Sequence, residues 1–122
     1  MTSRTEPSVD DLLPLQAATF HILMALADED RHGYAIIQEI SARTDGAIRL
    51  SAGTLYRSLQ RMLAQGLIEE TEDRPAPDDD DERRRYYRIT KFGQAVARAE
   101  ARRLQDLVRL ARASGFVARS AS

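Results

Sequence analysis

Apolar residues recur at helical spacing along the first part of the chain, and this pattern predicts two helices. The first stripe starts at Leu15 and ends before the charged segment "ADEDRHG" at residues 27–33. Its surroundings carry no charge, which indicates a helix buried on more than one side. The second stripe lies in "GYAIIQEISART" at residues 33–44, where Tyr34 and three isoleucines are expected to face inward.

A third helix can be placed from the residues at its two ends. Ser51 is of a type that caps helix N-termini, and Gly66 supplies a C-terminal stop just after Gln65. Apolar residues between these ends again follow helical spacing. The buried stripe of this helix is expected to consist of Leu55, Leu59, Met62 and Leu63.

Two short strands with a polar tip follow and predict a hairpin. "LIEETED" at residues 67–73 and "RRRYYRIT" at residues 83–90 are separated by "RPAPDDDDE", whose prolines and acids do not extend a sheet. Thr90 is then placed to cap a final helix from Lys91 to about Ala113. This order is that of a winged helix-turn-helix, a mainly α fold with a small β-hairpin, to which a long C-terminal helix has been added.

The length of the chain predicts one domain flanked by two tails. Residues 12–90 form the winged-helix domain, and residues 91–113 form the C-terminal helix. The segments 1–11 and 114–122 lack periodicity and are expected to be flexible.

The final helix carries apolar residues over a greater length than one small domain can cover. Packing against the uncharged first helix of a second copy would bury them, which predicts a homodimer in which the final helix is the dimerisation helix. The residues assigned to this interface are Leu15, Ile22, Leu104, Leu107, Val108 and Ala111.

Composition excludes several functions. The 122 residues include no cysteine, so disulfides and thiolate metal sites are excluded, and two histidines do not make a zinc site without converging carboxylates. There is no nucleophile with a base nearby in sequence and no glycine-rich phosphate loop. We therefore expect that the protein is not an enzyme and that it binds no metal and no cofactor. The longest uncharged run, residues 12–27, is too short to span a bilayer, and a cytoplasmic protein is expected.

Charge is distributed unevenly along the chain. The net charge is −1, but the run Asp78–Glu82 contributes five acids, and without it the chain would carry +4. Residues 46–68 contain no acid, while Arg49, Arg57 and Arg61 lie among them. A surface that approaches the phosphates of DNA excludes carboxylates in this way. The alternative is a solvated helix face on which arginines occur by chance.

The third helix is therefore predicted to contact double-stranded DNA with the face opposite its buried stripe. Small residues at its start let the N-terminal amides approach a phosphate, and arginine or glutamine side chains reach phosphates and base edges. Two roles are open to Tyr56, a hydroxyl contact to a phosphate or packing on the second helix. The residues assigned to this surface are Arg49, Ser51, Ala52, Thr54, Tyr56, Arg57, Gln60 and Arg61.

Three consecutive arginines, Arg83, Arg84 and Arg85, begin the second strand of the hairpin and are assigned to DNA as well. Wings place such side chains along the phosphate backbone or in the minor groove. Alternatively, they neutralise the adjacent acids Asp78–Glu82. That run lacks the spaced ligands and glycine of a calcium loop, so it is either a passive solvated tip or a competitor that pairs with the arginines and lowers non-specific DNA binding.

Three segments form a specific combination of motifs: "HGYAIIQEI" at residues 32–40, "LSAGTLYRSLQRMLAQGLIE" at residues 50–69 and "RRRYYRITKFGQAVARAE" at residues 83–100. On these segments the chain resembles the PadR-like family of transcriptional regulators, in particular the short subfamily with a single C-terminal helix. The resemblance extends over roughly residues 12–112.

This resemblance implies a dimeric DNA-binding regulator, usually a repressor, that is often relieved by a small aromatic or cationic ligand near the dimer interface. Two-fold symmetry would set the two third helices about 34 Å apart, so an inverted-repeat operator is expected. The candidate lining of a ligand site consists of Phe20, His21, Met24, Leu104 and Val108.

Two departures from the family pattern bear on these expectations. Arg57 stands where many family members carry proline, which leaves the third helix less interrupted and adds a positive charge. The chain has no tryptophan, so family members that sandwich flat drugs between tryptophans are a poor guide to its ligand.

Two other functional classes stay open at this point. Winged helices also serve as protein-interaction modules that do not touch DNA, and a small protein of this kind could act purely as a ligand sensor. The acid-free, arginine-bearing third helix argues against the first class, and the lack of a separate effector domain argues against the second.

Overall fold

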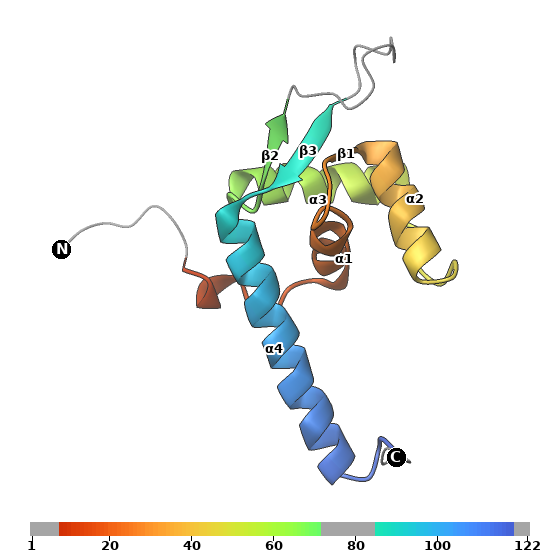
Figure 1. Cartoon of the computed structure of the whole chain (residues 1–122), viewed down its shortest axis with the longest axis vertical. Coiled ribbons are helices and arrows are strands. Elements are labelled where there is room, and N and C mark those ends of the chain that lie inside the picture. Colours follow the sequence, from red (N-terminus) through yellow and green to blue (C-terminus); the bar gives the residue numbers. More distant parts are fainter. Residues whose placement is uncertain (1–7, 72–84, 119–122) are drawn as a thin grey trace, which may run out of the picture.

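The computed structural model of the chain describes residues 8–71 and 85–118. Within them the predicted order of three helices, a hairpin and a long helix is confirmed, and one short strand is added (Figure 1). The elements are a 3₁₀ turn η1 (Asp10–Leu12), α1 (Ala17–Ala25), β1 (Arg31–His32), α2 (Gly33–Arg43), α3 (Ala52–Ala64), β2 (Ile68–Thr71), β3 (Tyr86–Ile89) and α4 (Lys91–Ala113).

The core lies where α1, α2 and α3 meet the sheet and the first half of α4. Ile22 and Leu23 of α1, Leu55 and Leu59 of α3 and Val96 of α4 have no exposed surface. α1 contacts α2, α3 and α4, so the prediction of a helix buried on more than one side is confirmed. A charged residue at one of the four buried positions of α1 would lose its contact with water, which explains why those positions carry no charge.

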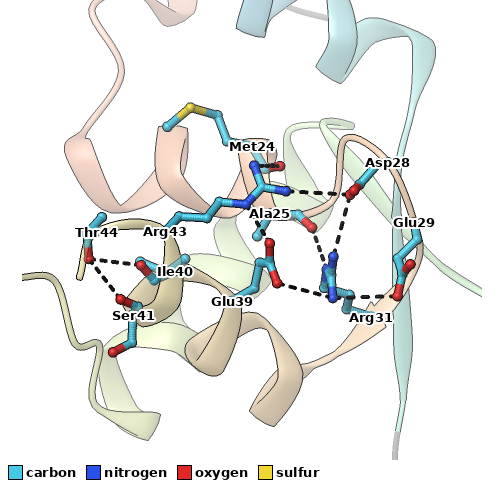
Figure 2. Close-up of polar contacts among 10 residues, drawn as sticks. All are labelled: Met24, Ala25, Asp28, Glu29, Arg31, Glu39, Ile40, Ser41, Arg43 and Thr44. Atoms are coloured by element: carbon cyan, nitrogen blue, oxygen red, sulfur yellow. Dashed lines mark hydrogen bonds and ion pairs between the residues drawn. The ribbon is translucent and has the colours of Figure 1, made fainter. Parts of the chain in front are cut away.

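Arg31 and Arg43 fix α2 against the end of α1 (Figure 2). The Nε of Arg31 donates to the carbonyl of Ala25 at 2.7 Å, and Nη1 of Arg43 donates to the carbonyl of Met24 at 3.2 Å. Carbonyls in the last turn of a helix lack the usual partner four residues on. Arg31 satisfies that of Ala25, and Arg43 adds a second bond to that of Met24, which also accepts from the backbone N–H of Ala27 at 3.2 Å. Both arginines also pair with the same two carboxylates, those of Asp28 and Glu39.

The turn between α2 and α3 uses residues that tolerate a left-handed backbone. Asp45 and Gly46 have positive φ angles of 53° and 81°. The hydroxyl of Thr44 donates to the carbonyl of Ile40 at 2.9 Å and accepts from the backbone N–H of Ile48 at 3.0 Å. These bonds hold the turn in shape and so set the direction of α3 relative to α2.

The sheet has three strands rather than the two predicted, in the antiparallel order β1-β3-β2. His32 of β1 pairs with Tyr86 of β3, and their rings meet edge to face with centroids 5.3 Å apart. β1 was missed because it is two residues long and its partner lies far along the chain. Within the described residues, β2 starts at Ile68, one residue later than predicted, and β3 extends over Tyr86–Ile89, inside the predicted segment 83–90. The rest of the predicted strand segments, residues 72–73 and 83–84, lies outside the described part.

Thr90 and Gly93 join α4 to the corner between α3 and β2. Thr90 caps α4 as predicted, because its hydroxyl oxygen accepts from the backbone N–H of Gly93 at 2.9 Å. The same oxygen lies 2.6 Å from the carbonyl oxygen of Gly66, whose φ of +78° confirms it as the stop of α3. A side chain on Gly93 would collide with the carbonyl oxygen of Leu67, so α4 starts in direct contact with backbone.

The C-terminal half of α4 extends beyond the other elements (Figure 1). The helix begins and ends at the predicted residues, and every residue from 105 to 110 is exposed. At the other end of the domain, η1 lies where the predicted tail meets the winged helix, and Val9 packs against the core. In the described part of the chain, no helix has both the length and the apolar character needed to cross a membrane.

Candidate nucleic-acid interface

α3 has one buried face and one exposed face, as its spacing predicts. Leu55, Leu59 and Met62 are fully buried, and Leu63 is half-buried at the edge of the stripe. The opposite face carries the residues assigned to DNA. Of these, Thr54 is half-buried, and the exposed ones are Arg49, Ser51, Ala52, Tyr56, Arg57, Gln60 and Arg61.

The first turn of α3 presents backbone amides to solvent. Ser51 is the N-cap, as predicted, and its hydroxyl oxygen accepts from the backbone N–H of Thr54 at 3.1 Å. Ala52 and Gly53 are exposed and small, and no acid lies in this turn. The remaining free N–H groups and the positive end of the helix dipole can therefore approach an anion closely.

The three arginines of this surface have no carboxylate partner among the described residues. Nη2 of Arg57 lies 3.4 Å from the hydroxyl oxygen of Thr54, and Nη1 of Arg61 donates to the side-chain oxygen of Gln16 at 2.9 Å. Arg49 is exposed and lies beside Gly46. Their positive charges are therefore not neutralised within the described structure, in contrast to those of Arg31 and Arg43, which pair with Asp28 and Glu39.

The two tyrosines of α2 and α3, Tyr34 and Tyr56, are both exposed. Tyr56 is 48% exposed, and its hydroxyl packs so closely on Gly33 that a side chain there would overlap it. The expectation that Tyr34 faces inward is wrong, because its side chain is 61% exposed. The buried positions of α2 are Gly33, Ile36 and Ile40, and Tyr34 is rotated out of that stripe by one residue.

Of the three wing arginines assigned to DNA, Arg85 lies among the described residues. Arg85 is exposed, and its Nη1 pairs with the carboxylate of Glu70 on β2 at 3.1 Å, so part of its charge is neutralised locally. Arg83, Arg84 and the acidic run Asp78–Glu82 lie outside the described residues, and the roles predicted for them stay predictions.

The two tyrosines of β3 are both buried, although a pleated strand points them to opposite faces. Tyr87 belongs to the core, while Tyr86 packs against His32 of β1. Burial raises the pKa of the Tyr87 phenol, with a further contribution from Glu70 opposite it. The Tyr87 hydroxyl is therefore neutral at physiological pH.

The residues assigned to the dimer interface divide by burial. Leu107 and Val108 are exposed, and Leu15, Leu104 and Ala111 are half-buried. Ile22 is completely buried inside the single chain, so its assignment to the outer surface is corrected: α1 turns it toward the core. Leu110 and Phe116, which sequence reasoning did not assign, are 63% and 84% exposed.

An open groove of about 550 Å³ lies between α1 and α4. Phe20, Leu104 and Val108 line it as proposed for a ligand, whereas His21 and Met24 are partly buried and are not among its lining residues. The other lining residues are Ala101, Gln105, Arg109 and Arg112. No group of three metal-ligating side chains gathers anywhere in the described residues.

One buried acid was missed by sequence reasoning. Glu100 of α4 is 2% exposed, and Arg103 donates to its two carboxylate oxygens at 2.8 and 2.9 Å. These bonds hold the pKa of Glu100 below its ordinary value, against desolvation and with help from the backbone N–H of Leu15. The sequence carried a signal, since Glu100 lies four residues from both Val96 and Leu104 in an otherwise apolar stripe.

Comparison with known sequences gives one matching family. The profile described as "Transcriptional regulator PadR-like family" matches residues 22–99. Transcriptional regulator Rv3488 of Mycobacterium tuberculosis is 39% identical over 93 residues, which cover 76% of this chain and 80% of that protein. A protein of Lysinibacillus sphaericus is 39% identical over 74 residues, which cover 61% of this chain and 65%, less than two thirds, of that relative.

Solved structures give the same architecture. A transcriptional regulator from Clostridium thermocellum is similar with a TM-score of 0.68 and 26% identity, over 82% of this chain and 89% of that one. Bacillus subtilis PadR in complex with operator DNA is similar with a TM-score of 0.57 over 70% of this chain and 47% of that one. At 16% identity the second likeness is one of fold.

Proposed function

The chain belongs to the PadR-like family of transcriptional regulators, and we propose that it binds an inverted-repeat operator as a homodimer and represses transcription there. A relative of the same fold was solved with operator DNA, which supports DNA as the partner. The tips of α3 and the wing are the parts of this fold that enter DNA grooves or follow the backbone in winged helices.

The exposed face of α3 is the observation that carries this proposal. Its arginines have no carboxylate partner in the described part of the chain, and no acid occurs from residue 46 to residue 68. Arg57 and Arg61 lie four residues apart, on one side of the helix. Cations held at this spacing can contact phosphates or base edges along one groove.

The apolar end of α4 supports the homodimer. Leu107 and Leu110 are 52% and 63% exposed on a helix that extends beyond its own domain. Exposed leucines of this kind are stabilised when a second copy covers them, and a two-fold axis makes the interface self-complementary. The same axis would present two α3 helices to one side of a duplex.

The groove between α1 and α4 is the proposed site of a small effector. Phe20 and Leu104 provide an apolar surface, and Arg112, which also lines the groove, forms no ion pair within the described residues. This combination favours an aromatic acid over a cation, since the ring is buried and the carboxylate meets a guanidinium. Screening aromatic acids and cationic dyes for release of the operator tests this order of preference.

Sequencing of genomic fragments retained by the purified protein tests the main proposal. Enriched sites should be near-palindromic, with half-site centres about 34 Å apart, and a gel shift with the DNA upstream of its own gene should resist unrelated competitor DNA. A reporter behind such a site should fall when the protein is supplied. Enrichment of no sequence by a folded protein would instead favour a protein-interaction module.

A further inference from the structure

Arg61 makes a contact that ties the exposed face of α3 to another part of the fold. Its Nη1 donates to the side-chain oxygen of Gln16 at 2.9 Å, across 45 positions of sequence. Both side chains are exposed. The bond uses one N–H of the five that a guanidinium carries, so the remaining donors stay available for DNA.

Gln16 is placed to cap α1, but its side chain does not do so. It is the N-cap residue by backbone geometry, with extended φ and ψ angles of −66° and 148°, and it makes no side-chain cap bond. The N-cap side chains of the other three α-helices, His32, Ser51 and Thr90, all accept a backbone N–H. The Gln16 amide is directed to Arg61 instead.

The segment that carries Gln16 is held from the other side by α4. Its neighbour Leu15 packs against the core. Glu100, buried in α4 and paired with Arg103, lies against the backbone of Leu15. The pair Leu15 and Gln16 therefore links α4, the helix proposed to form the dimer, to Arg61, a residue proposed to contact DNA.

We propose that Gln16 is a positioning residue for Arg61, holding its guanidinium in the orientation used for operator binding. The inference rests on the proposed function of α3. A free arginine side chain samples many rotamers and must be ordered on binding, and each immobilised side chain of this kind changes affinity by about two- to tenfold. Because Gln16 already holds the Arg61 side chain in the free protein, less side-chain conformational entropy is lost when DNA binds, and the affinity is higher.

A double-mutant cycle on operator affinity tests this role. Gln16→Ala should weaken operator binding about two- to tenfold, and it should have no further effect once Arg61→Ala is present. The melting temperature should stay unchanged, because both side chains are exposed. Gln94→Ala, an exposed glutamine on α4, is the matched control and should bind as the unsubstituted chain does.

Conservative variants separate orientation from mere contact. Gln16→Asn keeps the amide but is too short to reach, so it should resemble Gln16→Ala. Glu100→Gln should weaken the contact to the Leu15 backbone and so lower operator affinity by a smaller factor than Gln16→Ala does. This loss should appear only when Arg61 is intact.

Each outcome decides the matter. An unchanged affinity for Gln16→Ala, a gain in affinity, or losses that add with those of Arg61→Ala would overturn the positioning role. If the unsubstituted chain and Arg61→Ala bind all DNA alike, the proposed function itself has failed. If Arg61→Ala weakens binding but Gln16→Ala does not, the function stands and this inference alone is wrong.

Discussion

Arginine side chains in this protein differ in what their guanidinium groups contact. Arg31 and Arg43 satisfy helix carbonyls and share two carboxylates, so they hold α1 and α2 together. Arg57 and Arg61 contact neutral oxygen atoms within the described structure, which leaves their charge for an external anion. The sequence alone does not separate the two kinds, because pairing depends on neighbours brought together by the fold.

This division predicts that two substitutions to alanine differ in their effect on stability. Arg31→Ala should lower the free energy of unfolding by about 1–3 kcal/mol, since a buried carbonyl and several carboxylates lose their partner. Arg57→Ala should change it by less than about 0.5 kcal/mol. Urea denaturation measures both, and equal losses of stability would contradict the assignment.

Glu100 predicts a pH dependence of stability. Its pKa in the folded chain lies below the ordinary value of 4.5, chiefly because Arg103 donates to it. The ionised carboxylate therefore stabilises the fold fully above the unfolded pKa, and this contribution is lost as pH falls through the lower folded pKa. Glu100→Gln should be less stable at neutral pH and should lose less stability on acidification below about pH 4.5 than the unsubstituted chain. Thermal unfolding at pH 7 and pH 3 compares the two, and parallel pH curves would rule this role out.

Single residues with a local task were predictable from the sequence. Ser51, Thr90 and Gly66 are identified by type and position, because a cap or stop depends on a few neighbouring backbone atoms. Tyr34 and Ile22 were misplaced, because facing the core depends on where other helices lie. A shift of one position along α2 was enough to expose Tyr34.

At the scale of elements, the helices were predicted closely and the sheet less so. α3 and α4 show long, regular apolar spacing and recognisable ends. β1 has two residues and exists only because β3 lies beside it, so local sequence contains little sign of it.

Glycine positions predict where two elements touch backbone to backbone. Gly93→Ala should destabilise the chain by about 1–3 kcal/mol, because the new methyl group meets the Leu67 carbonyl and Ile89. Gly53→Ala, at an exposed helical position, should stabilise it by about 0.5–1 kcal/mol. If the start of α3 approaches a phosphate, Gly53→Ala should nevertheless weaken operator binding. A Gly93→Ala variant of unchanged melting temperature would disprove the close approach.

The exposed end of α4 predicts the oligomeric state. Leu107→Glu combined with Leu110→Glu should give monomers with poor operator affinity but an intact fold, because both leucines are more than half exposed in the single chain. Gln94→Glu adds one negative charge elsewhere on α4 and should stay dimeric. Light scattering measures the mass, and a dimer that survives the leucine substitutions would place the interface elsewhere.

For the whole molecule, the fold and the family follow from motifs spread over most of the chain. The matched profile covers residues 22–99, and the architecture agrees. The operator sequence and the effector do not follow in the same way, because they depend on which base edges and ring systems fit side chains whose positions the sequence does not determine. The groove between α1 and α4 is an example, because the sequence does not indicate that Arg112 lines it. Only the folded structure places Arg112 there.

Operator binding by the double variant Arg57→Ala and Arg61→Ala is the most direct test that α3 reads DNA. Fluorescence anisotropy with a selected operator and with random DNA, at two salt concentrations, provides the comparison. Each substitution should cost about 1–3 kcal/mol of operator affinity if it removes a base contact, while a phosphate contact should weaken binding to all sequences and flatten the salt dependence. A folded, dimeric double variant that binds the operator as tightly as the unsubstituted chain would contradict the assignment of α3 to DNA.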